Sequence, residues 1–272
     1  MSVLADLHIH STASDGQYTP SEIVALAKEK GLHAIALTDH DTLSGLAEAL
    51  EAGSAQGLRV IPGVEFSTDD YLNLHILGYG FPLDDPGLVK LTTGLKAGRD
   101  DRKYRIAGFL HNHGVDVPLS EVEEAATGGV IGRPHFAQVM LRHGIVATRK
   151  EAFDRYLDTP EFQEIERGTK PLAEECVKAV KAAGGKVSLA HPYQVVLGQD
   201  KLEDLVKRLA ACGLDAIECY YPQHTQEQTA EYLRLAKKYG LHVTGGSDFH
   251  GEKNKPDNLL TAWELELDWF SE

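Results

Sequence analysis

The sequence has few cysteines, no long hydrophobic run and fewer basic than acidic side chains. Its three cysteines, Cys176, Cys212 and Cys219, lack the spacing of metal ligands, which favours reduced thiols in a cytoplasmic protein. No apolar run approaches the roughly 20 residues that cross a bilayer, and the first residues lack the basic and apolar regions of a secretory signal. The 27 Lys and Arg against 41 Asp and Glu give a net charge of −14. This charge argues against binding to duplex DNA or to an anionic membrane.

The 272 residues fit one large domain, or one domain that carries an insertion. Short apolar segments that alternate with helical patterns predict strands at 3–10, 33–38, 58–66, 72–79, 186–190, 214–220 and 242–245. Helices are expected between them, the first opened by the capping box Thr19-Pro20-Ser21-Glu22. This rhythm is typical of an α/β fold with a largely parallel sheet and helices outside.

The alternation lapses between about residues 84 and 168. That stretch has helical patterns at 88–111, 133–143 and 150–156, no convincing strand, and a gathering of arginines. We therefore predict an α/β barrel formed by residues 1–83 and 169–272, interrupted by a mostly helical insertion at 84–168.

The 13 histidines include a group that the predicted strands bring together. His8 and His10 lie two apart on the first strand, so that both point to the same face. Ligand-type side chains recur at or near the ends of other strands, and strand ends of a barrel converge on one rim. The nine candidate metal ligands are His8, His10, Asp15, His40, Glu65, His75, His191, Asp248 and His250.

Nine ligands exceed the needs of a single ion and suit two or three divalent cations, with Glu65 as a bridge. Three such cations outweigh three carboxylates by three positive charges, which matches a phosphate dianion. Nitrogen and oxygen donors without thiolate favour Mn first, with Zn, Fe or Mg as alternatives. Each candidate ligand taken alone also has a simpler interpretation, since a single histidine on a strand is usually a hydrogen-bonded core residue. This alternative applies most strongly to His75, which apolar residues flank. Asp6 and Asp39 either hold ligand imidazoles or cap nearby backbone.

These motifs resemble the PHP (polymerase and histidinol phosphatase) family. The resemblance covers about residues 1–80 and 170–272, and all nine family ligand positions are filled. It implies a distorted (β/α)7 barrel with a trinuclear metal centre at the strand ends.

The insertion carries the candidate substrate-binding residues. Arg99 and Arg102 lie three apart on one helical face and can form a fork for phosphate. Arg133 opens another predicted helix, where backbone N–H groups add to anion attraction. The alternative is salt bridging with Asp100, Asp101 and Glu124. His135 is expected to contact the substrate or to protonate the leaving oxygen.

With these motifs the chain resembles the bacterial branch of nucleotide phosphatases and 5′→3′ exonucleases of the RNase AM type. The resemblance implies a metal-dependent phosphoesterase that removes the 3′ phosphate of nucleoside 3′,5′-bisphosphates and trims the ends of short RNA. A hydroxide that bridges the metals would attack phosphorus. The alternatives are a histidinol-phosphate phosphatase, and a non-catalytic or proofreading module as found attached to DNA polymerases.

Overall fold

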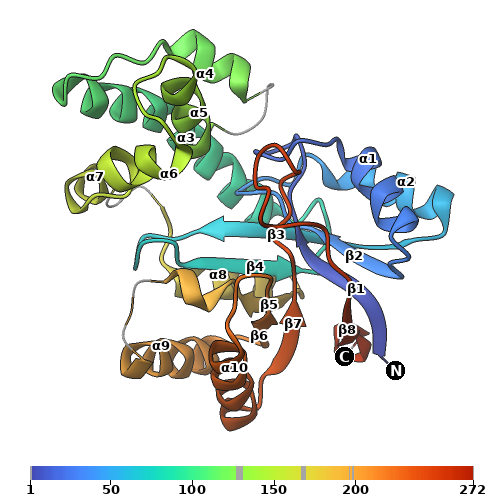
Figure 1. Ribbon diagram of the computed structural model, residues 1–272. Helices are drawn as coiled ribbons and strands as arrows, with labels where there is room; N and C mark the ends of the chain where they lie inside the picture. Colours follow the sequence, from blue (N-terminus) through green and yellow to red (C-terminus); the bar gives the residue numbers. More distant parts are fainter. Residues whose placement is uncertain (1, 127–130, 167–169, 196, 198, 272) are drawn as a thin grey trace.

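One curved sheet forms the centre of the molecule (Figure 1). The computed structural model describes residues 2–126, 131–166, 170–195, 197 and 199–271. Within this part the sheet has eight strands in the order β7-β6-β5-β4-β3-β2-β1-β8. They are β1 (Ser2–Ile9), β2 (Ala34–Leu37), β3 (Arg59–Ser67), β4 (His75–Tyr79), β5 (Lys186–Leu189), β6 (Ala216–Tyr220), β7 (His242–Gly245) and β8 (Trp263–Glu266).

The sheet is a distorted barrel, as predicted, but it is less parallel than the sequence indicates. β4 runs antiparallel to both β3 and β5, and β8 runs antiparallel to β1. β8 is an eighth strand that the sequence analysis did not predict. Its pairing with β1, together with a bridge between Ile9 and Phe249 just beyond β7, brings the two edges of the sheet toward each other. The barrel is therefore nearly closed.

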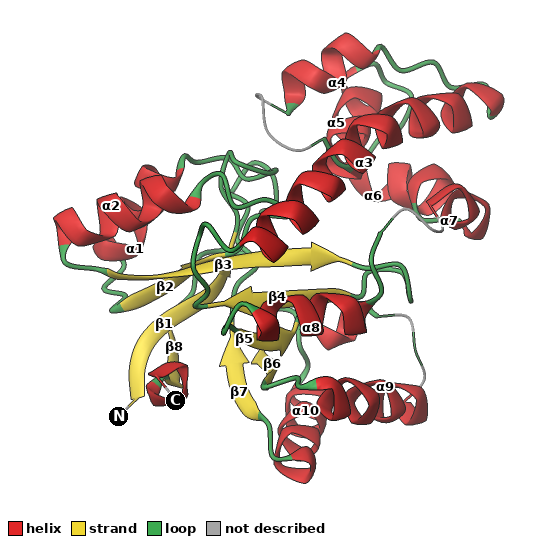
Figure 2. Ribbon diagram, turned by 180° about the vertical axis from the view of Figure 1, so that it is seen from behind, coloured by secondary structure: helices red, strands yellow, loops and turns green. Residues whose placement is uncertain are grey.

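Helices cover the outside of the sheet, with a hydrophobic layer between them and the strands, and five of them lie outside the insertion (Figure 2). The predicted capping box is present at the first of them: Glu22 N donates to Thr19 Oγ1, and Thr19 N donates to Glu22 Oε2 at 2.8 Å. These helices are α1 (Pro20–Glu29), α2 (Leu46–Gln56), α8 (Ala173–Ala182), α9 (Gln199–Cys212) and α10 (Gln226–Tyr239). Short 3-10 turns lie at Pro192–Gln194 and Asp268–Ser271.

The insertion is helical, as predicted. It comprises α3 (Pro86–Asn112), α4 (Leu119–Ala125), α5 (Arg133–Arg142), α6 (Arg149–Ala152), the π-helical turn Phe153–Leu157 and α7 (Pro160–Glu166). These helices pack around a hydrophobic cluster of their own, which contains Phe109, Phe136 and Phe162.

Helix α3 belongs to both parts of the molecule. Leu88 and Leu95 near its beginning are buried in the barrel's hydrophobic layer, whereas Ile106 and Leu110 belong to the cluster of the insertion. The transition between the two hydrophobic clusters therefore falls inside this helix rather than before it. None of the described helices combines the length and the apolar character needed to cross a membrane.

Candidate metal centre

All nine candidate ligands gather at one rim of the barrel. His8 lies in β1 and His10 follows its end, while Glu65 lies near the end of β3. His191 follows the end of β5 by two residues, and Asp248 follows the end of β7 by three. His75 is different, because it begins β4. Since β4 runs in the opposite direction, its beginning reaches the same rim as the ends of its neighbours.

Glu65 lies at the centre of the cluster and is fully buried. Each of its carboxylate oxygens faces more than one imidazole. Oε2 lies 3.0 Å from His40 Nδ1, 3.2 Å from His10 Nε2 and 3.3 Å from His8 Nε2. Oε1 lies 2.7 Å from His75 Nδ1 and 2.9 Å from His191 Nε2. This is the placement that a bridging carboxylate would need.

Two aspartates complete the cluster. Asp248 Oδ1 lies 3.3 Å from His10 Nε2, and Asp15 Oδ1 lies 3.2 Å from His250 Nε2. Three overlapping groups each offer ligand atoms within 4.8 Å of one another: His10, Asp15, His40 and His250; His8, His10, Glu65 and Asp248; and His40, Glu65 and His75. Because the groups share members, the cluster could hold neighbouring ions rather than isolated ones.

The cluster fits divalent cations in its chemistry as well. Within the described residues, His10 Nδ1, His40 Nδ1 and Glu65 Oε2 are buried and form no hydrogen bond of proper geometry, although the last two lie 3.0 Å apart. Buried polar atoms are normally satisfied, and a bound ion would explain these exceptions. The donors are imidazole nitrogens and carboxylate oxygens, a set that suits Mn, Fe or Zn.

The ionisable side chains of the cluster shift one another's pKa values. Burial raises the pKa of Glu65, but the neighbouring imidazoles of His40, His75 and His8 outweigh it and hold the pKa well below its usual value. Burial lowers the pKa of His40 and His75, and here the effect of Glu65 does not reverse it. Glu65 therefore favours its ionised form, and His40 and His75 favour their neutral forms, as metal ligands require. Burial lowers the pKa of His8 and of His10, but the neighbouring carboxylates outweigh it and raise the pKa of both, to about 9 for His10, so a metal ion would displace a proton from these two rings.

A second layer of contacts includes Glu218 on β6, a residue that the sequence analysis missed. It is fully buried and accepts a hydrogen bond of 3.1 Å from His8 Nδ1 and one of 2.7 Å from His191 N. The sequence contained a signal for this residue: it is a glutamate within the apolar strand 216–220. A charged residue is rarely buried without a partner, so this glutamate could have been expected to contact another polar group.

Asp248 is held by two further residues that the sequence analysis missed. Its Oδ2 accepts hydrogen bonds from Tyr221 Oη, at 2.8 Å, and from Lys255 Nζ. Burial raises the pKa of Asp248, but Lys255 and then His8 outweigh this and hold it well below its usual value. Only the other oxygen then faces the imidazoles.

Asp6 and Asp39 cap nearby backbone, which is one of the two roles considered for them. Asp6 accepts hydrogen bonds from Ser247 N and Oγ at 2.9 and 2.6 Å, and Asp39 accepts from Ser11 N and Oγ at 2.8 and 2.7 Å. Both therefore tie the loops at the rim of the barrel together instead of holding imidazoles.

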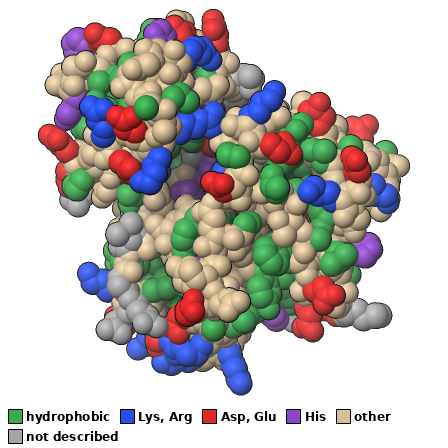
Figure 3. Space-filling model, viewed as in Figure 1, with side chains coloured by type: hydrophobic (Ala, Val, Ile, Leu, Met, Phe, Trp, Pro, Cys, Tyr) green, Lys and Arg blue, Asp and Glu red, His purple; other side chains and the backbone are tan. Residues whose placement is uncertain are grey.

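A small cavity of about 110 Å³ adjoins the cluster; we call it the metal-side cavity. Asp15, His40 and His75 of the cluster line it. Three basic residues line the same cavity: Arg102, Arg133 and Lys170. Figure 3 shows histidine side chains at the bottom of a hollow between the insertion and the barrel. Lys170 lies three residues before the beginning of α8 and was not singled out from the sequence.

Arg133 opens α5, as predicted, and its guanidinium connects the insertion with the barrel. Nη1 donates to Asp158 Oδ1, and Nη2 donates to Asn73 Oδ1 on the β3–β4 connection at 3.0 Å. Its acidic partner within the described part of the structure is Asp158, which the sequence analysis did not consider.

The other candidate substrate-binding residues differ in their surroundings. Arg102 is buried, with 6% of its surface exposed, and lines the metal-side cavity. The side chain of Arg99 lies outside the described part of the structure. His135 is also buried, and Gly132 N donates to its Nδ1 at 2.9 Å, so that it caps α5. It does not line the metal-side cavity.

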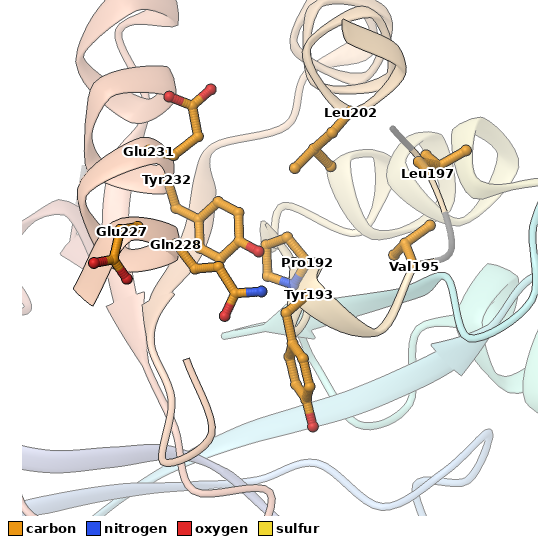
Figure 4. A pocket seen from close by; sticks show the side chains of 9 residues that line it. All are labelled: Pro192, Tyr193, Val195, Leu197, Leu202, Glu227, Gln228, Glu231 and Tyr232. Carbon is orange, nitrogen blue, oxygen red and sulfur yellow. The ribbon is translucent and has the colours of Figure 1, made fainter. Parts of the chain in front are cut away.

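A further pocket of about 320 Å³ lies away from this centre, between the 3-10 turn at 192–194, α9 and α10 (Figure 4). Gln228 and Tyr232 of α10 point into it, and none of the nine candidate ligands lines it. It carries Glu227 and Glu231, which would repel a phosphate.

The fold and the cluster define a metal-dependent phosphoesterase. The chain belongs to the PHP domain family, whose pattern matches residues 6–159. A solved structure from Bifidobacterium adolescentis, described as a candidate metal-dependent phosphoesterase, has a TM-score of 0.84 and 31% identity over 98% of this chain and 93% of its own.

The names of two curated relatives describe activities on RNA or nucleotides. A 5′-3′ exoribonuclease of Haemophilus influenzae is 34% identical, over 95% of this chain and 97% of its own length. A 3′,5′-nucleoside bisphosphate phosphatase of Chromobacterium violaceum is 30% identical, over 90% of this chain and 86% of its own length. A phosphoribosyl 1,2-cyclic phosphate 1,2-diphosphodiesterase of Eggerthella lenta is similar to the same extent, with 33% identity over 92% and 95%.

Proposed function

We propose that this protein hydrolyses the 3′ phosphate of nucleoside 3′,5′-bisphosphates to give 5′-nucleotides, and that it trims short RNA from the 5′ end by the same chemistry. The names of the relatives in Haemophilus influenzae and Chromobacterium violaceum support this choice.

The single observation that carries the proposal is the mixed lining of the metal-side cavity. Candidate metal ligands and the basic residues Arg102, Arg133 and Lys170 line the same cavity. A substrate with one phosphate needs only the metal ligands. Additional basic groups are useful when a second anion lies at a fixed distance from the first, as in a nucleoside bisphosphate.

The nine ligands named above would hold two or three divalent ions, Mn first among them. When bound, such ions polarise a phosphoryl oxygen and lower the pKa of water to about 7. Glu218 keeps the ring of His8 oriented, and Tyr221 with Lys255 fixes the carboxylate of Asp248. The basic side chains of the cavity would hold the 5′ phosphate, so that the 3′ ester points to the metal ligands. The insertion, 84–168, would thus act as the substrate-binding part of the enzyme.

The proposal is tested by the products. With Mn²⁺, adenosine 3′,5′-bisphosphate should yield 5′-AMP and orthophosphate, while 5′-AMP itself is cleaved poorly. Chromatography against authentic 2′-, 3′- and 5′-AMP identifies the bond that breaks. Accumulation of 3′-AMP would reverse the proposed orientation.

Two other activities are measured in the same assay. Efficient turnover of histidinol phosphate alone would favour a histidinol-phosphate phosphatase, which needs no second anion site. Preference for a 1,2-cyclic phosphate would favour the activity named for the relative in Eggerthella lenta. Absence of turnover on every phosphate ester would favour a non-catalytic module.

A further inference from the structure

A second, larger cavity of about 560 Å³ adjoins the metal-side cavity; we call it the outer chamber. The two share five lining residues: Thr68, Tyr71, Leu72, Arg133 and Lys170. Arg133 and Lys170 therefore stand at the junction, with the metal cluster on one side and the outer chamber on the other.

The two cavities differ in size, and each could hold a different part of one nucleotide. Pockets that bury a small organic ligand usually measure roughly 300–1,000 Å³. The metal-side cavity, at about 110 Å³, is too small for a whole nucleotide, whereas the outer chamber falls in this range. A bisphosphate whose phosphates lie on the metals and on the junction must place its base elsewhere, and the outer chamber is the adjoining space.

The walls of the outer chamber suit a neutral, flat ring. Tyr71 and Leu72 offer an aromatic and an aliphatic surface, and Gln163 offers an amide. Beyond the junction the charged lining residues are Asp69, Asp70 and Asp158, which disfavour a further phosphate. The Tyr71 side chain is 40% exposed, so one part of its surface remains accessible.

The segment that carries Tyr71 is held in place from both sides. Asp69 N donates to Pro171 O at 3.0 Å, and Asp70 Oδ2 accepts from Ala173 N at 2.6 Å. At its other end, Asn73 Oδ1 accepts the hydrogen bond from Arg133. The segment that carries the ring is thus positioned relative to the junction before any ligand binds, which reduces the entropic cost of binding.

We propose that the outer chamber binds the nucleobase of the substrate, stacked on the ring of Tyr71, while Arg133 and Lys170 hold the 5′ phosphate. This inference rests on the proposed function and assigns the base-binding residue of the same site. Because every base has a π face, stacking tolerates all four bases. The site would therefore accept nucleotides and RNA ends of any sequence, with Gln163 as a minor source of preference.

The test compares the binding of two ligands that differ only in the base. Calorimetry of the full-length, Mn²⁺-loaded protein measures the Kd of 5′-AMP and of ribose 5-phosphate. Wild type should bind 5′-AMP more tightly. Tyr71→Ala should weaken the binding of 5′-AMP by about 5- to 150-fold, the usual range for loss of one stacked base. It should leave ribose 5-phosphate unchanged.

Two variants serve as controls. Tyr71→Phe keeps the ring and should keep the affinity for 5′-AMP. Tyr104→Ala removes a tyrosine that is 61% exposed and lines neither cavity, and should change nothing. Thermal unfolding checks that each variant is folded.

Three results would overturn the inference: equal affinity of wild type for the two ligands, an equal loss for both in Tyr71→Ala, or no loss at all in that variant. None of these measurements requires turnover. Failure of the proposed function is recognised separately, when wild type releases no 5′-AMP from adenosine 3′,5′-bisphosphate.

Discussion

Glu218 accepts a hydrogen bond from Nδ1 of His8, and this contact decides which nitrogen of the ring faces the metal cluster. The two atoms lie 3.1 Å apart, while Nε2 of the same ring lies 3.1 Å from His10 Nε2. The carboxylate favours a proton on Nδ1, so that an ion would displace the proton of Nε2 and take its lone pair. One buried glutamate therefore sets both the tautomer and the direction of a candidate metal ligand.

Glu218→Gln should weaken metal binding and activity by about 10- to 100-fold, since an amide oxygen is a weaker partner for the imidazole. Titration with Mn²⁺ measures the loss, and excess Mn²⁺ should restore part of the activity. Glu203→Gln, which changes a glutamate paired with Arg234 and Lys238 on the surface, serves as the control. Unchanged metal affinity in Glu218→Gln would contradict the role assigned to this contact.

His10→Ala and Asp248→Ala should lose metal and activity together. His10 belongs to two of the three ligand groups, so its loss should reduce the metal content by more than one site. Elemental analysis of protein purified without chelator should give two to three equivalents for wild type. Circular dichroism checks that the barrel remains folded, and full activity of a metal-free protein would refute the metal centre.

Arg133→Ala should lower kcat/KM for a substrate with two phosphates about ten- to a hundredfold. A hydrogen bond to a charged group contributes about 1.5–3 kcal/mol. Hydrolysis of a simple aryl phosphate, which has no second anion, should change little. An equal loss on both substrates would assign the arginine to the reaction centre or to the fold.

Asp158→Asn separates phosphate binding by Arg133 from its structural contacts. Asp158 pairs with the guanidinium and would compete with a phosphate for it, so its neutral replacement should lower KM for the bisphosphate. If the arginine served only to join the insertion to the barrel, Asp158→Asn would instead raise KM in the same way as Arg133→Ala. Steady-state kinetics on both variants distinguishes the two outcomes.

Gly246→Ala should destabilise the protein by at least the roughly 1–3 kcal/mol that overpacking usually costs. An added Cβ would lie 2.2 Å from His8 Cβ and 2.9 Å from His8 N, and neither atom can move without the strand. Gly94→Ala is the matched control: its Cβ meets nothing within 4 Å in α3 and should stabilise the helix by about 0.5–1 kcal/mol. Denaturant unfolding measures both variants, and an unchanged Gly246→Ala would contradict the close packing.

Much of the centre could be predicted because residues two apart on a strand share a face. His8 and His10 on or just after β1 follow this rule, and Glu65 and His191 are recognised by their places at or near strand ends. The sequence also predicts the capping box of α1 and the beginning of α5 at Arg133. These features depend on local spacing, which the sequence contains in full.

Contacts between distant segments could not be predicted in the same way. The apolar pattern of β4 does not reveal its direction, and its reversal is what brings His75 to the rim. β8 has only four residues and gains its stability from pairing with β1 at the opposite end of the chain. The pairing of Arg133 with Asp158 likewise depends on how the insertion folds back on itself.

The shared helix α3 limits how the molecule can be divided. A chain shortened by residues 84–168 would keep every candidate metal ligand, yet it would lose the leucines at 88 and 95 that cover part of the barrel. The exposed apolar patch would favour aggregation over an independent barrel. The insertion is therefore not a detachable accessory: genetic removal at its sequence boundaries would cost solubility before it revealed anything about catalysis.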